Sequence, residues 1–116
     1  MLSFPKPEMI EVGDVELEVF QEGQGGIPVV LAHGCPEHAF SWRYQVPALV
    51  AEGYHVIVPN QRGYGRSSQP ESVESYDCHH MTSDYNALLD VLGIDKAVFV
   101  GHDWGAILVW HHALLN

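Results

Sequence analysis

An aspartate, Asp103, lies between a short apolar run and a second apolar segment whose residues recur at helical spacing. Gly101 and Gly105 flank it, and a tight turn from a strand straight into a helix needs residues without side chains at such positions. The residue at the apex of this turn projects from the sheet at a helix N-terminus, where a carboxylate is stabilised as an anion. Asp103 could therefore attack an electrophilic carbon and form an ester. A simple helix cap is the alternative interpretation.

An ester on Asp103 would have to be hydrolysed, and water adding to its carbonyl carbon places negative charge on the carbonyl oxygen. Two N–H donors must point at that oxygen. The turn supplies one from Trp104, and we expect the second from the backbone of Cys35, in the loop after an earlier strand. Gly34 allows a close approach there and Pro36 stiffens the loop. We interpret the thiol of Cys35 as incidental.

The chain has eight histidines, but their spacing does not predict a metal site. The adjacent pairs His79–His80 and His111–His112 do not face each other on a helix, and no HExxH pattern occurs. No cofactor is expected. His33 and His102 are close to the nucleophile in sequence and are interpreted as residues that brace loops. His111 lies about 12 Å from Asp103 along the expected helix, so it cannot act as the general base for a reaction at Asp103.

Three apolar runs, at residues 28–32, 54–58 and 96–100, lack alternation of polar and apolar side chains. Continuous runs of this length are typical of strands buried on both faces of a parallel sheet. Residues 15–19 instead alternate apolar and acidic side chains, which indicates a strand with one face in water. Residues 9–12 are its expected hairpin partner.

Helical spacing of apolar side chains predicts helices at residues 42–50, 81–92 and 106–115. Gly93 is expected to end the second of these. The alternation of buried strands and helices indicates an α/β fold with a mainly parallel sheet and an antiparallel N-terminal hairpin. The loops that begin at His33, Asn60 and Asp103 should converge at the carboxyl edge of this sheet. That convergence favours a catalytic Asp103 over a cap.

The composition excludes several classes of partner. The 116 residues carry a formal charge of −10, from 15 acidic and 5 basic residues, so nucleic acid and anionic membranes are not expected partners. No apolar run is long enough to span a bilayer, and the N-terminus lacks the apolar core of a targeting signal. Cys35 and Cys78 form no CxxC pair, so we expect free thiols and a cytoplasmic protein.

Four motifs occur in a characteristic order: His33-Gly34-Cys35-Pro36-Glu37, Phe40-Ser41-Trp42-Arg43, residues 61–68 (QRGYGRSS) and Gly101-His102-Asp103-Trp104-Gly105. Together they resemble the soluble-type epoxide hydrolases of the α/β-hydrolase fold, from about Val12 to the last residue. The resemblance implies Asp103 as the nucleophile and the Cys35 and Trp104 backbones as oxyanion donors. It also implies a substrate pocket lined by Trp104 and Pro36. Asn60 stands where the family usually has Asp, and Cys35 where an aromatic residue is common.

In this family the general base, the acid that orients it and the lid with its tyrosines follow the nucleophile, whereas only residues 104–116 follow Asp103 here. We therefore expect residues 1–116 to be an incomplete core domain that ends in the helix after the nucleophile turn. The lid and the C-terminal core would be absent, and the chain alone inactive. The strand at 96–100 would then have an unpaired apolar edge that recruits the remaining part of the enzyme or a second copy.

Three functions remain open at this point. The first is addition of water to an epoxide, giving a vicinal diol through an Asp103 ester. The second is haloalkane dehalogenation with the same nucleophile and the Trp104 indole among the halide donors, although many such enzymes have Asn at the position of Cys35. The third is a truncated, non-catalytic core that acts by binding or assembly. Serine hydrolysis is disfavoured because no GxSxG motif occurs.

Overall fold

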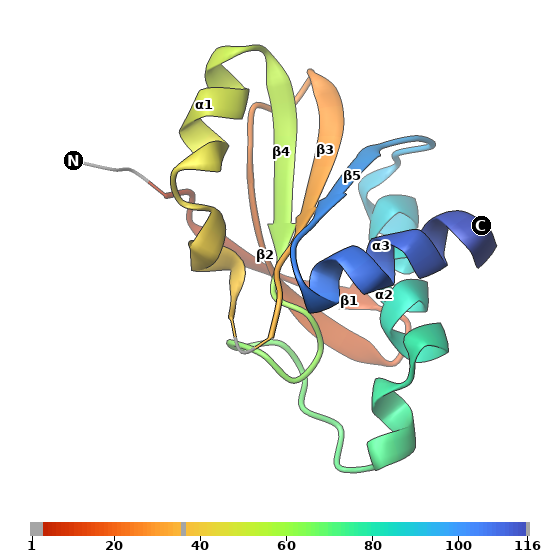
Figure 1. Cartoon of the computed structure of the whole chain (residues 1–116). Helices are drawn as coiled ribbons and strands as arrows, with labels where there is room; N and C mark the ends of the chain where they lie inside the picture. Colours follow the sequence, from red (N-terminus) through yellow and green to blue (C-terminus); the bar gives the residue numbers. More distant parts are fainter. Residues whose placement is uncertain (1–3, 36, 116) are drawn as a thin grey trace.

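The computed structural model describes residues 4–35 and 37–115, and Figure 1 shows the arrangement of its elements. Pro36 lies outside this range. The strands are β1 (Pro7–Val12), β2 (Val15–Glu22), β3 (Ile27–Ala32), β4 (Tyr54–Pro59) and β5 (Val98–Gly101). The α-helices are α1 (Gln45–Ala51), α2 (Cys78–Leu92) and α3 (Trp104–Leu115), and short 3₁₀ helices cover Ala39–Trp42 and Val73–Tyr76.

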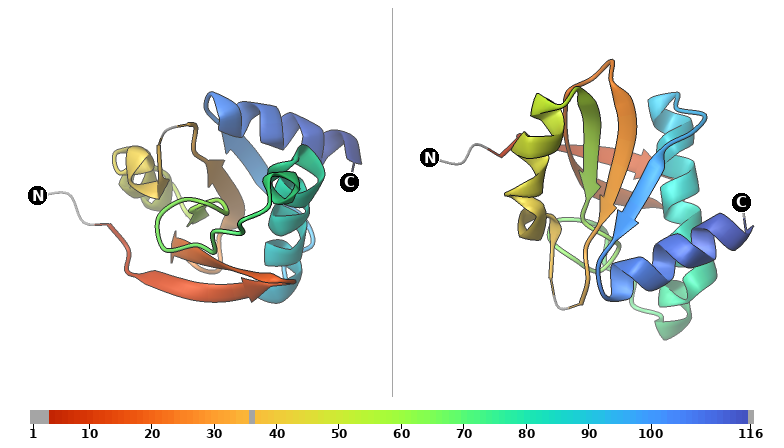
Figure 2. Two further views of the ribbon diagram at one scale, coloured as in Figure 1. Left: turned by 90° about the horizontal axis from the view of Figure 1, so that it is seen from below. Right: turned by 45° about the horizontal axis from the view of Figure 1, so that its top comes forward.

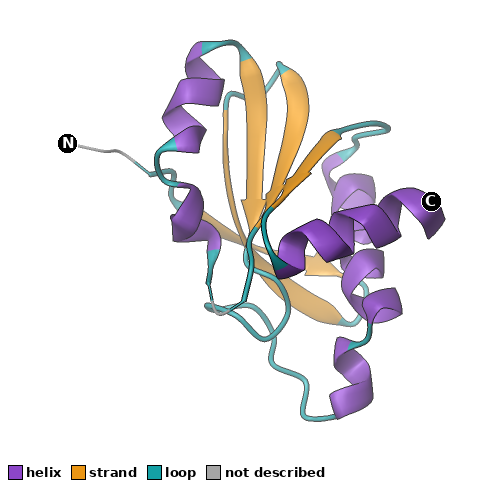
Figure 3. Cartoon of the chain, in the orientation of Figure 1, coloured by secondary structure: helices purple, strands orange, loops and turns teal. Residues whose placement is uncertain are grey.

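The strands form one mixed sheet in the order β1-β2-β4-β3-β5. β1 and β2 are an antiparallel hairpin, β2 pairs antiparallel with β4, and β4, β3 and β5 are mutually parallel. The predicted fold class is therefore confirmed. Because β3, β4 and β5 run the same way, the loops after them lie together at one edge, the lower edge of Figure 3.

Helices cover both faces of the sheet, with α1 on one face and α2 and α3 on the other (Figure 2). Alternate residues of β3 enter different cores: Val29 and Leu31 pack with the α1 side, and Val30 with the α2 and α3 side. This two-sided burial explains why the strand reads as a continuous apolar run. None of the helices in the described part of the chain is both long enough and apolar enough to cross a bilayer.

Several predicted element boundaries are corrected. The third parallel strand begins at Val98 instead of residue 96, and the helix expected from residue 42 begins at Gln45 because Trp42 belongs to a 3₁₀ turn. The helix predicted from residue 81 begins at Cys78, since the Asp77 side chain caps it by accepting a hydrogen bond from His80 N. Its predicted end is confirmed at Gly93, whose φ of 71° gives a left-handed cap.

β5 lies at an edge of the sheet and pairs only with β3 among the described strands. Its Val98 and Val100 side chains are 51% and 39% exposed, and Trp110 of the neighbouring α3 is 71% exposed. An apolar groove of about 540 Å³ runs between β5 and α3. An unpaired apolar edge of this kind is a surface suited to receiving another strand.

Candidate active site

Asp103 occupies the turn between β5 and α3 in a left-handed conformation, with φ of 59°. It is the only non-glycine residue of the described chain with a positive φ. A Cβ at Gly101 would lie 2.5 Å from Gly105 O, and a Cβ at Gly105 would collide with Ala32 O. The two glycines therefore allow the strand to turn back directly into the helix, and this turn holds Asp103 at the carboxyl edge of the sheet.

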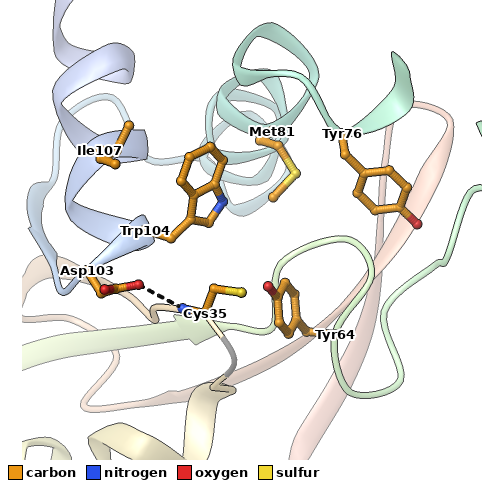
Figure 4. A pocket seen from close by; sticks show the side chains of 7 residues that line it. All are labelled: Cys35, Tyr64, Tyr76, Met81, Asp103, Trp104 and Ile107. Atoms are coloured by element: carbon orange, nitrogen blue, oxygen red, sulfur yellow. Dashed lines mark hydrogen bonds between the residues drawn. The ribbon is translucent and has the colours of Figure 1, made fainter. Parts of the chain in front are cut away.

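The carboxylate of Asp103 lies beside two backbone N–H groups, those of Trp104 and Cys35. Interaction with Trp104 N–H and then with Cys35 N–H lowers the pKa of Asp103 below its usual range. The Cys35 N to Asp103 Oδ2 distance is 3.2 Å (Figure 4). The side chain is exposed to the cavity and is held as an anion, which is the state that a nucleophile requires.

The loop after β3 is closed tightly around Gly34. Gly34 N donates to Glu37 Oε1 at 3.0 Å, and Glu37 N donates to Gly34 O at 3.0 Å. A Cβ at Gly34 would lie 2.7 Å from Asp103 Cβ and 2.6 Å from Glu37 Oε1. Glycine at this position thus lets the loop approach Asp103 closely. Pro36 was predicted to line the substrate pocket, and it lies outside the residues that the structure describes.

His33 is completely buried and links two of the loops at this edge. Its Nε2 accepts a hydrogen bond from Gln61 N at 3.1 Å, which assigns the proton to Nδ1, 2.8 Å from Gly34 O. The side chain of Gln61 donates back to His33 O at 2.7 Å. Burial lowers the pKa of His33, so the ring is a neutral brace with both nitrogens in use.

His102 is exposed, and its Nδ1 lies 3.0 Å from Glu37 Oε1, outside the cavity. This hydrogen bond lowers the pKa of Glu37. His111 lies within α3, where its Nδ1 is 3.0 Å from Ile107 O. No group of three His, Cys, Asp or Glu side chains in the described residues is arranged to hold a metal ion.

A cavity of about 470 Å³ opens beside the Asp103 carboxylate (Figure 4). It is lined by Cys35, Tyr64, Tyr76, Met81, Asp103, Trp104 and Ile107. Sequence reasoning placed Asp103, Cys35 and Trp104 at the site but missed the two tyrosines, Met81 and Ile107. Two signals were available for Tyr64, namely its place in a loop expected at the same edge of the sheet and its place in the motif at residues 61–68. Met81 was assigned only to the buried face of a helix.

Two polar networks hold the loop after β4 in place. Asn60 donates from Nδ2 to Glu18 Oε1 at 2.9 Å and accepts from Ala39 N at 2.6 Å. Arg62 is 2% exposed and makes a bidentate pair with Asp84 at 2.7 Å for both contacts, which raises the pKa of Arg62. The loop that carries Tyr64 is therefore anchored to β2 and to α2.

Comparison with known proteins matches residues 27–116 to the α/β-hydrolase fold family. The chain is 53% identical over 97% of its length to epoxide hydrolase A of Mycobacterium tuberculosis, of which it covers 35%. It is 47% identical over 82% of its length to bifunctional epoxide hydrolase 2 of Sus scrofa, of which it covers 17%.

Solved structures give the same result. The crystal structure of epoxide hydrolase A from Mycobacterium thermoresistibile superimposes with a TM-score of 0.94 and 53% identity, covering 97% of this chain and 35% of that one. An epoxide hydrolase from Vigna radiata superimposes with a TM-score of 0.90 and 40% identity. The match covers 94% of this chain and 35% of the Vigna radiata chain. The chain thus spans about a third of the length of several of these relatives.

Proposed function

The chain belongs to the α/β-hydrolase fold family, among its epoxide hydrolases, and from this premise we propose that it supplies the nucleophile and the oxyanion hole of an enzyme that converts an epoxide and water into a vicinal diol. The observation that carries the proposal is the Cys35 N–H donating to Asp103 Oδ2 beside a cavity. A helix cap alone would not require a donor from a second loop.

In the first half of the reaction, the carboxylate oxygen of Asp103 not held by Cys35 attacks an epoxide carbon. The carbon–oxygen bond of the ring breaks, and the released alkoxide takes a proton from a donor. The product is an alkyl ester on Asp103. The lowered pKa of Asp103 keeps the carboxylate ionised for this attack.

In the second half, water adds to the ester carbonyl carbon and negative charge develops on Oδ2. The Cys35 N–H already donates to Oδ2, and the backbone N–H of Trp104 lies beside the same carboxylate, which supports a role for both in stabilising that charge. Removing one such donor in an acyl-transfer enzyme costs about 100- to 1000-fold in rate. Collapse of the intermediate releases the diol and regenerates Asp103.

The water must be activated by a base that these residues do not supply. Both nitrogens of His33 are engaged, and His102 and His111 lie outside the cavity. We propose that residues 1–116 are the first part of a core domain, and that the base, its acid and a lid belong to the remaining two-thirds found in the relatives. The free edge of β5 and the groove beside it would pair with that part.

A single turnover in water labelled with heavy oxygen tests the ester mechanism in the complete hydrolase. With enzyme in excess, the first diol should be unlabelled, and the Asp103 peptide should gain one heavy oxygen. Asp103→Ala should abolish both diol and label. A diol labelled in the first turnover would mean direct attack by water and overturn the proposal. Halide release from a haloalkane faster than diol formation would instead indicate a dehalogenase.

A further inference from the structure

The cavity beside Asp103 contains three polar side chains that the proposed reaction does not use, Cys35, Tyr64 and Tyr76. In Figure 4 the Cys35 thiol points toward the Tyr64 hydroxyl, and the Trp104 indole lies on the opposite side of the cavity. The hydroxyl of Tyr76, also in the lining, is already engaged, because it donates to Pro70 O at 2.6 Å. The remaining lining is mostly apolar, so Tyr64 and Cys35 form a distinct polar region of this wall.

Tyr64 is held rigidly. Its backbone N donates to Gln61 O at 2.9 Å, and its carbonyl accepts from Ser67 N at 3.0 Å. Its ring meets the buried His33 ring edge-on, with 4.7 Å between centroids and an interplanar angle of 71°. The hydroxyl is thus placed by the scaffold before any ligand arrives, which reduces the entropy lost on binding.

The Tyr64 hydroxyl faces a side chain that is a weak hydrogen-bond acceptor, the Cys35 thiol. Burial raises the pKa of Tyr64 to about 12, with further contributions from the neighbouring Cys35 side chain and from the Asp103 charge. The hydroxyl therefore keeps its proton at neutral pH and can donate a hydrogen bond, and the group that it faces in Figure 4 is the Cys35 sulfur. Thiol sulfur accepts hydrogen bonds poorly, and an oxygen of a ligand would replace it favourably.

The charge around the cavity limits what that oxygen can be. Asp103 is an anion in the same cavity, and the chain carries a formal charge of −10, so an anionic group is repelled. The oxygen must therefore be uncharged. Met81, Trp104 and Ile107 line the remainder and suit a hydrocarbon portion.

We infer that Tyr64 and Cys35 form a substrate-positioning pair, and that the substrate is a neutral epoxide with an ether, carbonyl or hydroxyl oxygen close to the ring. The inference rests on the proposed function and names the substrate class for the same site. The Tyr64 hydroxyl donates to this substrate oxygen, and the Cys35 thiol holds the Tyr64 hydroxyl in place before substrate binds.

Two isosteric epoxides test this in the complete hydrolase: butyl glycidyl ether and the terminal epoxide of octane, in which a methylene replaces the ether oxygen. The kcat/KM ratio should favour the ether about two- to tenfold, the effect of one hydrogen bond. Tyr64→Phe should bring this ratio to about one, through KM for the ether rather than kcat.

The pair also predicts that substitutions of Cys35 change the preference for the ether in opposite directions. Each of these variants keeps the backbone N–H of residue 35. Cys35→Ala frees the Tyr64 hydroxyl and should raise the preference for the ether. Cys35→Ser provides a stronger acceptor and should lower it. Tyr76→Phe is the matched control, because its hydroxyl already donates to Pro70 O, and the ratio should stay at the parent value.

Failure of the inference can be separated from failure of the proposed function. If Asp103→Ala abolishes diol formation but Tyr64→Phe leaves the ratio unchanged, or lowers both substrates equally, the pair is overturned and the function stands. If the complete enzyme hydrolyses neither epoxide, the proposed function fails. In that case the Tyr64–Cys35 pair is tested by binding alone. The Asp103→Asn variant should bind the ether epoxide more tightly than the octane epoxide, and Tyr64→Phe should remove this difference in Kd.

Discussion

The backbone N–H of Cys35 donates a hydrogen bond to Asp103 Oδ2 at 3.2 Å, although 68 positions separate the two residues in the sequence. The parallel pairing of β3 with β5 brings them together, because Ala32 and Gly101 are register partners at the ends of these strands. His102 N continues the ladder by donating to Ala32 O at 3.2 Å. The loop and Asp103 are thus positioned by one pair of strands, and a change in either should affect both.

Gly34→Ala should lower the activity of the complete hydrolase about 100-fold without unfolding it. A Cβ there would lie 2.7 Å from Asp103 Cβ, so the loop with Cys35 N must move away from the carboxylate. A misplacement of about 1 Å at a reacting group costs on the order of 100-fold in rate. The measurement is kcat/KM together with the melting temperature.

Gly93→Ala is the matched control for this variant. Gly93 has φ of 71° and open space around its Cβ position, so alanine there introduces backbone strain far from the site. It should cost about 1 kcal/mol of stability and leave kcat/KM at the parent value. Equal loss of activity in both variants would mean that Gly34 acts only through global stability.

The 116-residue chain alone should not turn over epoxides, because it lacks a base for the second half of the proposed reaction. Co-expression with the remaining part of a complete hydrolase chain should restore diol formation, since β5 has a free edge that can receive a further strand. Diol formation is the measurement. Saturable hydrolysis by the chain alone, lost in Asp103→Ala, would contradict this prediction.

Sequence reasoning located the tight turn at Asp103 and the buried strands because both depend on local patterns. Glycines at fixed positions around Asp103 specify the turn, and continuous apolar runs specify strands buried on two faces. The lining from Tyr64 and Met81 could not be predicted, since it depends on how the loop after β4 folds back. That conformation is set by long-range partners, such as Arg62 with Asp84, and not by periodicity.

Asp84→Ala should destabilise the protein by about 3 to 5 kcal/mol, because it leaves the Arg62 guanidinium buried without its charged partner. Asp14 also lies near Arg62, at 3.7 Å, but is 81% exposed, so Asp14→Ala should change stability by about 0.5 kcal/mol or less. Chemical denaturation measures both. The double variant Arg62→Met with Asp84→Leu should recover much of the loss. No recovery would mean that Asp84 has a further role.

Stability should fall as the pH drops below about 6.5. Burial lowers the pKa of His33, and also those of His55 and His112, relative to the ordinary value of 6.5. The unfolded chain therefore binds protons more readily than the folded one in the window from 6.5 down to the lowered values, and protonation favours unfolding there. Denaturation at several pH values measures the effect. An NMR titration in which His33 protonates at or above 6.5 would contradict it.

Asn60→Asp should destabilise the protein increasingly as the pH rises. Asn60 Nδ2 donates to Glu18 Oε1 at 2.9 Å, and both residues are buried, at 3% and 7% exposure. Aspartate would place two carboxyl groups in contact, so the pKa of one of them would be raised in the folded state. A raised folded pKa means that the folded variant holds its proton while the unfolded chain releases it above about 4. Stability relative to the parent is then lost from about pH 4 upward, by about 2 to 4 kcal/mol at neutral pH.

The double variant Asn60→Asp with Glu18→Gln separates charge repulsion from a change of shape. It restores one amide and one carboxylate with the donor and acceptor exchanged, while Ala39 N can still donate to residue 60. Denaturation across the acid-to-neutral range should show the pH-dependent loss in Asn60→Asp and its near absence in the double variant. Since the same loop carries Tyr64, the ether preference should decline in the single variant and return in the double. A double variant no more stable than the single one would show that Asn60 is required for its geometry and not to avoid a second charge beside Glu18.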